Sequence, residues 1–227
     1  MKDWKQITGS LDQAGFAKIS NALTAEECNE LINNYDNDRL YRNTIDMKRY
    51  RFGEGQYRYF TYPLPPLIQK IRTEFYPPLA RLANEWNEKL SIDLRYPESH
   101  PEFIAMCHEK HQLRPTPLIL RYDAGGHNTL HQDLYGDIYF PFQVVFLLTQ
   151  PGQDHEGGEF VLTEQVPRAQ SIARVVHAIK GDAVIFTTNF RPVSGTRGYY
   201  RAKLKHGVSM VLSGRRYAMG VIFHDGN

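Results

Sequence analysis

Hydrophobic and polar positions change their spacing along the chain near Pro115 to Pro117. Before this point, apolar residues recur at spacings of three and four, which is typical of amphipathic helices. After it, short runs of β-branched and aromatic residues are separated by Gly, Asn, Asp or Pro, which is typical of strands. The pattern therefore predicts a helical first half and a β-rich second half.

Three helices are expected in the first half, after a short strand. Thr24, with Glu27 three residues later, forms a capping box that opens the first helix. Proline pairs begin the other two helices, because the first turn of a helix tolerates a residue without an N–H. The expected strand and helices cover residues 15–19, 25–35, 64–75 and 78–90.

Strands are expected throughout the second half, at residues 118–122, 144–148, 159–163, 172–177, 183–187, 207–212 and 217–223. Short strands at this spacing indicate a β-sandwich or barrel. The chain shows no internal repeat, low-complexity segment or flexible linker, so we expect a single domain over residues 1–227. Within it, residues 1–115 are expected to form a mainly helical flank, and residues 116–227 the β core.

Composition excludes several classes of protein. The 27 Lys and Arg residues and the 25 Asp and Glu residues leave a net charge of only +2, so no global charge bias indicates a polyanion or a membrane surface. The longest uncharged apolar stretch, residues 138–151, is shorter than the roughly 20 residues of a membrane-spanning helix. The N-terminus lacks the apolar segment of a secretory signal, and Cys28 and Cys107 are expected to be free thiols. We therefore expect a cytoplasmic protein without a membrane partner.

One His-x-Asp triplet is a candidate for metal binding. His131 and Asp133 lie two residues apart in an extended segment, so their side chains can point the same way and share a metal ion. His206, next to a later expected strand, could complete the two-histidine, one-carboxylate face of non-haem Fe(II) oxygenases. Spacing alone leaves an alternative open, in which these residues are a hydrogen-bonded core histidine and a turn aspartate.

Longer motifs resemble the 2-oxoglutarate/Fe(II) dioxygenase superfamily. Residues 122–133 are similar to the Tyr-x-x-Gly and His-x-Asp segments of prolyl 4-hydroxylases and AlkB-like demethylases. Residues 157–160 and 181–186 resemble the glycine-led strands of those enzymes. Four motifs more specifically resemble a bacterial family described as oxygenases of damaged nucleic acid, and they cover residues 130–136, 157–165, 191–198 and 206–209.

The resemblance implies a mainly β fold, the double-stranded β-helix. This is a distorted jelly roll of two facing sheets, here with the N-terminal helices packed on one sheet. The resemblance also implies Fe(II) held by His131, Asp133 and His206, with 2-oxoglutarate and O₂ as co-substrates. Tyr122 would donate its hydroxyl to a carboxylate of 2-oxoglutarate. The implied reaction is hydroxylation of a C–H bond, which on an N-methyl group releases formaldehyde and so demethylates a base.

The distal carboxylate of 2-oxoglutarate needs a cation, and the planar fork of an arginine can bind both of its oxygens. We assign Arg216 rather than Arg215 to this role. If residues 213–215 form a three-residue hairpin loop, Leu212 opposes Arg216, and Arg216 then shares the inward face with His206. A two-residue loop would reverse that conclusion. The Arg-x-Ser triplet of AlkB-like demethylases is absent after Arg216.

Two basic stretches suggest an anionic substrate. Residues 39–62 hold six Lys and Arg residues interleaved with seven Tyr and Phe residues, which suits single-stranded nucleic acid or a flipped base. Residues 191–216 hold seven more basic residues and no acidic residue. In the alternative interpretation, the aromatic residues pack helices on the β core and the basic residues are solvated or paired with acids elsewhere.

Three functions stay open at this stage. They are an oxygenase of alkylated or otherwise damaged nucleic acid, a peptidyl hydroxylase of the prolyl 4-hydroxylase kind, and a non-catalytic module that binds 2-oxoglutarate. Cys107, His108 and His111 lack the spacing of a zinc site, so we expect them to be structural. His127 belongs either to the substrate pocket or to a loop. Nothing in the sequence indicates the oligomeric state.

Overall fold

The computed structural model describes residues 2–134 and 136–227, so Tyr135, within one of the family-like motifs, lies outside the described residues. The α-helices are α1 (Trp4–Ala14), α2 (Ala25–Asn33), α3 (Pro66–Lys89) and α4 (His100–Glu109), and the 3₁₀ helices are η1 (Asp38–Leu40) and η2 (Met47–Tyr50). The strands are β1 (Phe16–Ile19), β2 (Tyr41–Asp46), β3 (Gly53–Glu54), β4 (Gln56–Phe60), β5 (Leu118–Asp123), β6 (His127–His131), β7 (Phe142–Leu147), β8 (His155–Gly157), β9 (Phe160–Gln165), β10 (Ile172–Val176), β11 (Ala183–Thr187), β12 (Phe190–Gly195), β13 (Gly198–Val208) and β14 (Val211–Ile222).

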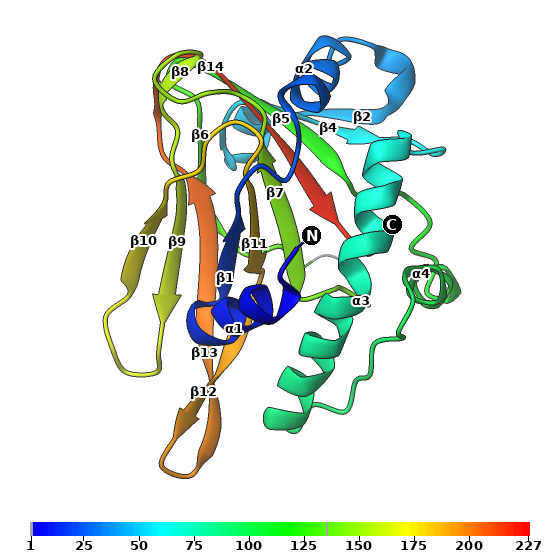
Figure 1. Ribbon diagram of the computed structural model, residues 1–227, viewed down its shortest axis with the longest axis vertical. Coiled ribbons are helices and arrows are strands. Elements are labelled where there is room, and N and C mark those ends of the chain that lie inside the picture. The colour runs from blue at the N-terminus through cyan, green and yellow to red at the C-terminus, as the bar shows by residue number, and fades with distance from the viewer. Residues whose placement is uncertain (1, 135) are drawn as a thin grey trace.

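Two antiparallel sheets form the body of the molecule (Figure 1). The larger sheet has the strand order β1-β11-β7-β14-β5-β4-β2, with β8 beside β14. The smaller sheet has the order β10-β9-β13-β6-β3, with β12 beside β13. The chain passes back and forth between the sheets, because β5, β7, β11 and β14 belong to the larger sheet and β6, β9 and β13 to the smaller one. This arrangement is a jelly roll.

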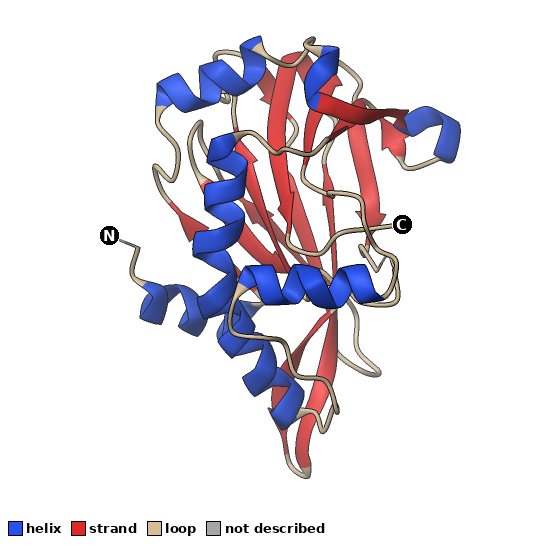
Figure 2. Cartoon of the chain, turned by 90° about the vertical axis from the view of Figure 1, so that its right-hand side faces the viewer, coloured by secondary structure: helices blue, strands red, loops and turns tan. Residues whose placement is uncertain are grey.

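The helices cover the outer face of the larger sheet (Figure 2). Alternate residues of its strands, including Phe146, Met219 and Val221, are fully buried in one core with the apolar face of α3. The rings of Trp86 and Phe142 lie 4.8 Å apart across this interface. The predicted class, mainly β with helices packed on one sheet, is therefore confirmed.

Helix α3 corrects one prediction, because the two helices expected at residues 64–75 and 78–90 are a single helix. Pro77 and Pro78 lie inside it, although a proline removes a backbone hydrogen bond and costs about 3 kcal/mol in a helix interior. The helix continues because Phe75, Leu79 and other apolar residues on both sides of the prolines are buried against the sheet. Packing therefore outweighs local propensity.

The connection between β13 and β14 corrects a second prediction. The expected strand at residues 207–212 spans a turn at Ser209 and Met210, and the expected loop at residues 213–215 lies inside β14. Gly214 does have a positive φ of 75°, but it pairs with His155 of β8 instead of turning the chain. The premise used to choose Arg216 over Arg215 is therefore wrong.

Strands β2, β3 and β4 were not expected in the mainly helical flank. In β4, Tyr57 and Tyr59 face the space between the sheets, whereas Arg58 and Phe60 are buried on the other side. Because both faces of this strand are covered, it lacks the alternation of apolar and polar residues by which a half-exposed strand is detected. In the described residues, no helix is both long enough and apolar enough to span a bilayer.

Candidate functional site

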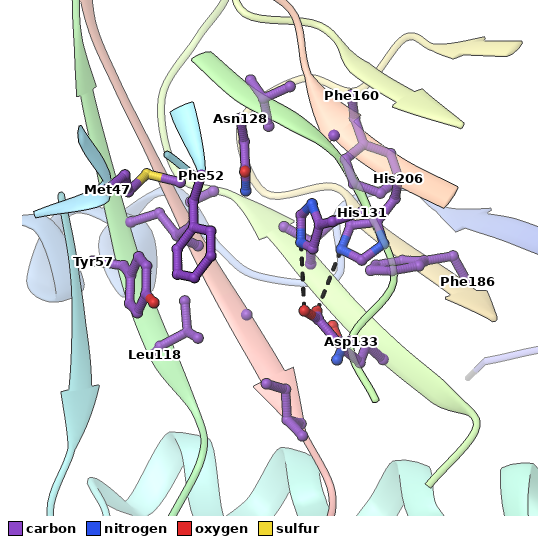
Figure 3. A pocket seen from close by; sticks show the side chains of 18 of the residues that line it. Met47, Phe52, Tyr57, Leu118, Asn128, His131, Asp133, Phe160, Phe186 and His206 are labelled. Carbon is purple, nitrogen blue, oxygen red and sulfur yellow. Dashed lines mark ion pairs between the residues drawn. The ribbon is translucent and has the colours of Figure 1, made fainter. Parts of the chain in front are cut away.

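A cavity of about 310 Å³ lies between the facing sides of the two sheets (Figure 3). Strands β4, β5 and β14 of the larger sheet line it with alternate residues, as the period of two along a strand requires. Most of the lining is apolar or aromatic, with a small number of polar groups, which is the usual character of a small-molecule site. The polar and charged lining residues include Asn128, His131, Gln132, Asp133, Gln143, His206 and Arg216.

Two histidines and one aspartate meet on one side of this cavity. His131 ends β6 and pairs in register with His206 of β13, and Asp133 follows two residues after His131. The Nε2 atoms of His131 and His206 lie 3.4 Å from Oδ1 and Oδ2 of Asp133, respectively (Figure 3). One ligand atom from each residue lies within 4.8 Å of the others. The expected trio is thus brought together by two neighbouring strands.

The histidine side chains are oriented for a ligand at Nε2. His131 Nδ1 lies 2.7 Å from the carbonyl oxygen of Thr129, and a carbonyl can only accept, so this nitrogen carries the hydrogen. The lone pair of His131 is then on Nε2, which faces Asp133. A histidine whose other ring nitrogen is held by a carbonyl is the usual arrangement in metal sites.

The electrostatics of the trio favour the protonation states that bind a metal. Burial raises the pKa of Asp133, but hydrogen bonding to His206 and attraction by both histidines outweigh it and hold that pKa well below its usual range. Burial, followed by the nearby His206, lowers the pKa of His131. At neutral pH the site therefore presents a carboxylate and a neutral imidazole, as metal coordination requires.

Arg216 enters the cavity from β14. It is 3% exposed, and within the described part of the chain it forms no hydrogen bond or ion pair. Its guanidinium lies over the Tyr122 ring, 5.6 Å from the centroid, and burial lowers the pKa of Arg216. Arg215 points the other way, is exposed, and pairs with Asp123. Arg216 thus lies in the cavity, although the hairpin argument that selected it fails.

Tyr122 lies beneath Arg216 with its side chain fully buried. Burial raises the pKa of Tyr122 to about 12, so its hydroxyl stays protonated near neutral pH and can donate a hydrogen bond. The Asn128 side chain lies beside this hydroxyl. A buried cation and a buried donor side by side form a natural site for a carboxylate.

The donor set fits a particular class of metal. Two imidazole nitrogens and one carboxylate on a single face, with the cavity on the other side, are the ligands of non-haem Fe(II) oxygenases. A structural zinc site would close all four positions with protein ligands. Three buried nitrogens of residues that line this cavity, Gln143 Nε2, His206 Nδ1 and Arg216 Nε, also lack a partner in the described residues, which is costly unless a ligand or water supplies one.

A family model matches residues 55–226, about three quarters of the chain. That family, Oxygenase-NA, is described as an oxygenase catalysing oxidative methylation of damaged DNA. This chain belongs to it. The resemblance inferred from the sequence motifs is therefore confirmed at the level of the family.

Other similarities agree with this assignment. Uncharacterized proteins from two strains of Mycobacterium tuberculosis are 44% identical to this Oxygenase-NA member over 166 residues, which is 73% of this chain and 71% of theirs. A Pseudomonas putida prolyl 4-hydroxylase matches the structure with a TM-score of 0.57 at 14% identity, covering 98% of this chain and 100% of that one. An oxidoreductase of the 2-oxoglutarate/Fe(II) oxygenase family from Burkholderia pseudomallei matches with a TM-score of 0.57 at 14% identity, over 99% and 93% of the chains. The fold is the double-stranded β-helix that was expected.

The first basic stretch of the Oxygenase-NA chain separates into structural and exposed parts. Arg58 is buried, pairs with Asp38 and donates to the carbonyl oxygen of Tyr35 at 2.6 Å. It is therefore not placed to contact the phosphates of a nucleic acid, as the nucleic-acid interpretation requires. Arg42 donates to the carbonyl oxygen of Pro115 at 2.9 Å. The exposed cations that remain are Arg39, Lys48, Arg49 and Arg51.

The second basic stretch divides in the same way. Arg191, which is partly buried, pairs with the buried Glu164 of β9, at 2.9 Å between Nη2 and Oε1. An acid from another strand therefore neutralises it, although residues 191–216 contain no acidic residue. Arg215 pairs with Asp123, and Arg216 lies in the cavity. The exposed remainder comprises Arg197, Arg201, Lys203 and Lys205.

The histidines left open by the sequence have structural surroundings. Cys107 is buried on α4, and Nε2 of His108 lies 3.0 Å from Oδ2 of Asp225. His111 follows α4 with a positive φ of 60°. His127 is the first residue of β6, and its Nδ1 lies 3.2 Å from the carbonyl oxygen of Gly125 in the preceding turn. Both cysteines are free, as expected.

Gln143 is a residue of the site that sequence reasoning passed over. It lies in β7, lines the cavity and helps to keep the pKa of Asp133 low, after the larger effects of burial and the two histidines. A single amide inside the apolar run of residues 140–148 was a usable signal, because a buried strand excludes a polar side chain unless it has a partner. Phe52 was noted only as part of a basic aromatic stretch, and it also lines the cavity.

Proposed function

We propose that this protein is an Fe(II)- and 2-oxoglutarate-dependent dioxygenase that hydroxylates a C–H bond, and that alkylated single-stranded nucleic acid is its substrate. The observation that carries the proposal is the trio of His131, Asp133 and His206 in one cavity with the buried, unpaired Arg216. The chain's family, described as acting on damaged DNA, supports the substrate class.

Each residue of the trio has a defined part in the proposal. His131 and His206 would bind the metal through Nε2, and Asp133 through its carboxylate. Fe(II) bound there supplies the activation of O₂ that oxidises 2-oxoglutarate to succinate and CO₂ and delivers one oxygen atom to the substrate. Because the three ligands occupy one face, the other positions stay open to co-substrate.

Arg216 and Tyr122 would hold 2-oxoglutarate. The guanidinium can bind both oxygens of the distal carboxylate, and the protonated Tyr122 hydroxyl can donate to a carboxylate oxygen. The buried charge of Arg216 has no protein partner in the described residues, so an incoming carboxylate would supply the missing one. The surrounding apolar residues exclude water and strengthen this pairing.

An aromatic pair suits a planar substrate. Phe52 lines the cavity and is 40% exposed, so it stands where the cavity meets solvent, and its ring stacks on that of Tyr50 at 5.6 Å. The carbonyl oxygen of Phe52 accepts two hydrogen bonds from Thr129, on the strand that carries His131. In Figure 3 Phe52 and Tyr57 face the trio across the cavity. Exposed rings in this position can stack with a nucleobase.

The direct test is anaerobic reconstitution with Fe(II) and 2-oxoglutarate, followed by exposure to O₂ with candidate substrates. N-methylated single-stranded oligonucleotides should yield succinate and formaldehyde in equal amounts, because hydroxylation of an N-methyl group gives a hemiaminal that releases formaldehyde. Unmethylated strands serve as the matched control. Absence of succinate with every substrate would overturn the dioxygenase proposal itself.

The substrate class has its own test. Phe52→Ala should raise the KM for a methylated oligonucleotide by roughly 5- to 150-fold, since stacking on one aromatic ring is worth about 1–3 kcal/mol. Arg49→Ala and Arg51→Ala should each reduce the log–log salt slope of oligonucleotide binding by about 0.7. Lys110→Ala, an exposed change at the end of α4, is the control for surface charge. Salt-independent binding would exclude phosphate contacts.

A peptidyl hydroxylase is the second candidate. Arg216 follows His206 by ten residues, and this spacing resembles that of the basic residue in prolyl hydroxylases. This candidate predicts that a peptide drives succinate release without formaldehyde, since a hydroxylated carbon in a side chain is stable. The same assay therefore separates the two candidates. A non-catalytic module is disfavoured by the complete ligand trio.

A further inference from the structure

Two glycines lie against the residues that would hold 2-oxoglutarate. Gly158 follows β8 with a φ of 71°, and a Cβ placed on it would lie 2.7 Å from Cδ of Arg216. Gly55 precedes β4, and a Cβ placed on it would lie 2.7 Å from Cδ1 of Tyr122. Both distances are shorter than real Cβ contacts allow. Neither position can therefore carry a side chain unless its neighbour moves.

These contacts form one layered arrangement. The guanidinium of Arg216 lies over the ring of Tyr122, so the order through the layers is Gly158, Arg216, Tyr122 and Gly55. Arg216 and Tyr122 are also register partners on the neighbouring strands β14 and β5. Arg216 and Tyr122 thus lie against each other, and each also lies against the backbone of a glycine.

The glycine backbones cannot easily retreat from this arrangement. The N–H of Gly158 donates to the carbonyl oxygen of Met210 at 3.0 Å, and β8 is paired with β14 on the same side. The carbonyl oxygen of Gly55 accepts from the N–H of Met47 at 3.0 Å. An added methyl group would therefore push on Arg216 or Tyr122 rather than displace the chain. Val211 Cγ2, at 2.9 Å from the same Cβ position on Gly158, closes another direction.

We propose that Gly158 and Gly55 are positioning residues for the co-substrate, which set the location of the Arg216 guanidinium and the Tyr122 hydroxyl by having no side chain of their own. This inference rests on the proposed use of 2-oxoglutarate. Bidentate recognition of a carboxylate depends on the placement of both N–H groups, so a shift of about 1 Å forfeits much of it. The glycine pair at residues 157 and 158 then has a functional reason beyond its turn geometry.

The test compares two glycines with the same backbone conformation. Gly152 has a φ of 78°, close to that of Gly158, but a Cβ placed on it would meet nothing within 4 Å. Gly158→Ala and Gly152→Ala therefore share the strain of a left-handed alanine, and only the first presses on Arg216. The measurement is calorimetric titration of 2-oxoglutarate into the Mn(II)-loaded protein, which needs no turnover.

Gly158→Ala should weaken 2-oxoglutarate binding on the order of tenfold or more, the loss expected when one charge-assisted hydrogen bond is forfeited. Gly152→Ala should bind like the wild type. In an Arg216→Ala background, Gly158→Ala should have no further effect, because its influence passes through Arg216. Full additivity of the two changes would overturn the proposal.

A second pair of variants covers the case in which Gly158→Ala fails to fold. Gly55→Ala should weaken 2-oxoglutarate binding, whereas Gly125→Ala, with a φ of 88° and nothing within 4 Å of an added Cβ, should not. Equal binding by each variant and its control would overturn this inference alone. A wild-type protein that does not bind 2-oxoglutarate would overturn the proposed function and this inference with it.

Discussion

In the part of the chain that the structure describes, two clusters of buried charged and polar residues differ in how completely their atoms are paired. One, the C-terminal cluster, comprises Arg72, His100, Gln112, His224 and Asp225 behind the larger sheet. Arg72 donates to Asp225 at 3.0 Å, to Tyr62 at 3.1 Å and to the carbonyl oxygen of Phe223 at 2.7 Å. Only its Nε lacks a partner in the described residues.

The other members of the C-terminal cluster are equally well bonded. Gln112 donates to the carbonyl oxygen of Asp225 at 2.6 Å and accepts from the N–H of Ile138 at 2.8 Å. His224 Nδ1 accepts from the N–H of Phe140 at 3.1 Å. The cluster ties the C-terminal segment to α3 and α4, and its histidines and charges have a structural role.

The second cluster, the cavity cluster, comprises His131, Asp133, His206 and Arg216. It also contains histidines, an aspartate and an arginine, but its polar atoms are poorly paired. Arg216 is buried, at 3% exposed against 0% for Arg72, yet across the described residues it forms no hydrogen bond and no ion pair. The histidine–aspartate pairs lie at 3.4 Å, beyond the usual length of a charge-assisted bond. Burial of charge alone therefore does not distinguish the two clusters, whereas unpaired buried charge beside a cavity does, and it is the feature on which the proposed co-substrate site rests.

The largest expected effect is a loss of activity without a loss of folding when a residue of the His–Asp–His trio is replaced. His131→Ala, Asp133→Ala and His206→Ala should each abolish 2-oxoglutarate turnover, a loss beyond the roughly 10- to 100-fold caused by removing an outer partner of a metal ligand. Succinate release is the measurement, with circular dichroism to show that each variant folds. Full activity in His206→Ala would remove that ligand assignment, and exposed His177 would be the next to test.

Removing Arg72 should lower the stability of the fold and leave the affinity for 2-oxoglutarate unchanged. Arg72→Met leaves the fully buried Asp225 without its cation, and loss of one partner of a buried ion pair costs about 3–5 kcal/mol. Urea unfolding measures this loss, and the surviving folded protein should keep its affinity for 2-oxoglutarate. An unchanged free energy of unfolding would mean that the C-terminal cluster does not stabilise the fold.

Arg216→Ala should weaken 2-oxoglutarate binding by about a hundredfold, since a buried carboxylate would lose its only cation. Arg215→Ala should change it by less than about threefold, because Arg215 is exposed and its surface ion pair is worth at most about 1 kcal/mol. The measurement is the dissociation constant of 2-oxoglutarate from the metal-loaded protein. Equal effects of the two changes would refute the placement of the carboxylate.

The last prediction concerns acid stability. Burial lowers the pKa values of His100 and His224 to about 4, below their unfolded value of 6.5. The unfolded chain therefore binds protons first, and stability present above pH 6.5 should fall as the pH drops towards 4. Each histidine contributes about 1.4 kcal/mol per pH unit within that window. Urea unfolding from pH 7 to 5 measures the slope, which His100→Gln should reduce.

The sequence predicted best what depends on a short segment. His131 and Asp133 could be paired because residues two apart in an extended chain share a face. The ten-residue spacing after His206, which resembles that of prolyl hydroxylases, pointed to Arg216, but the hairpin used to separate it from Arg215 does not exist, because Gly214 pairs with β8. The true placement of Arg216 depends on the register of β14 with β5, which no local pattern encodes.

Other features depended on partners distant in the sequence. Arg58 pairs with Asp38, and Arg191 pairs with Glu164. These two arginines, which the sequence suggested as substrate contacts, therefore bind to other parts of the fold. Helix α3 runs through two prolines because the sheet beneath it supplies the burial. In each case a contact with a distant part of the chain decides the outcome, against the local pattern. For this reason the number of basic residues overestimated the exposed basic surface.

The pairing of strand β14 limits where residues can be inserted into this chain. The strand is one ladder of twelve residues that meets β8 at its start and β5 and β7 further along, so inserting a single residue between Ser209 and Arg216 would turn the arginine out of the cavity. The tip of the β12–β13 hairpin, by contrast, extends beyond the other strands of the smaller sheet and lies away from that ladder (Figure 1). Relatives should therefore keep the interval from residue 206 to residue 216 constant.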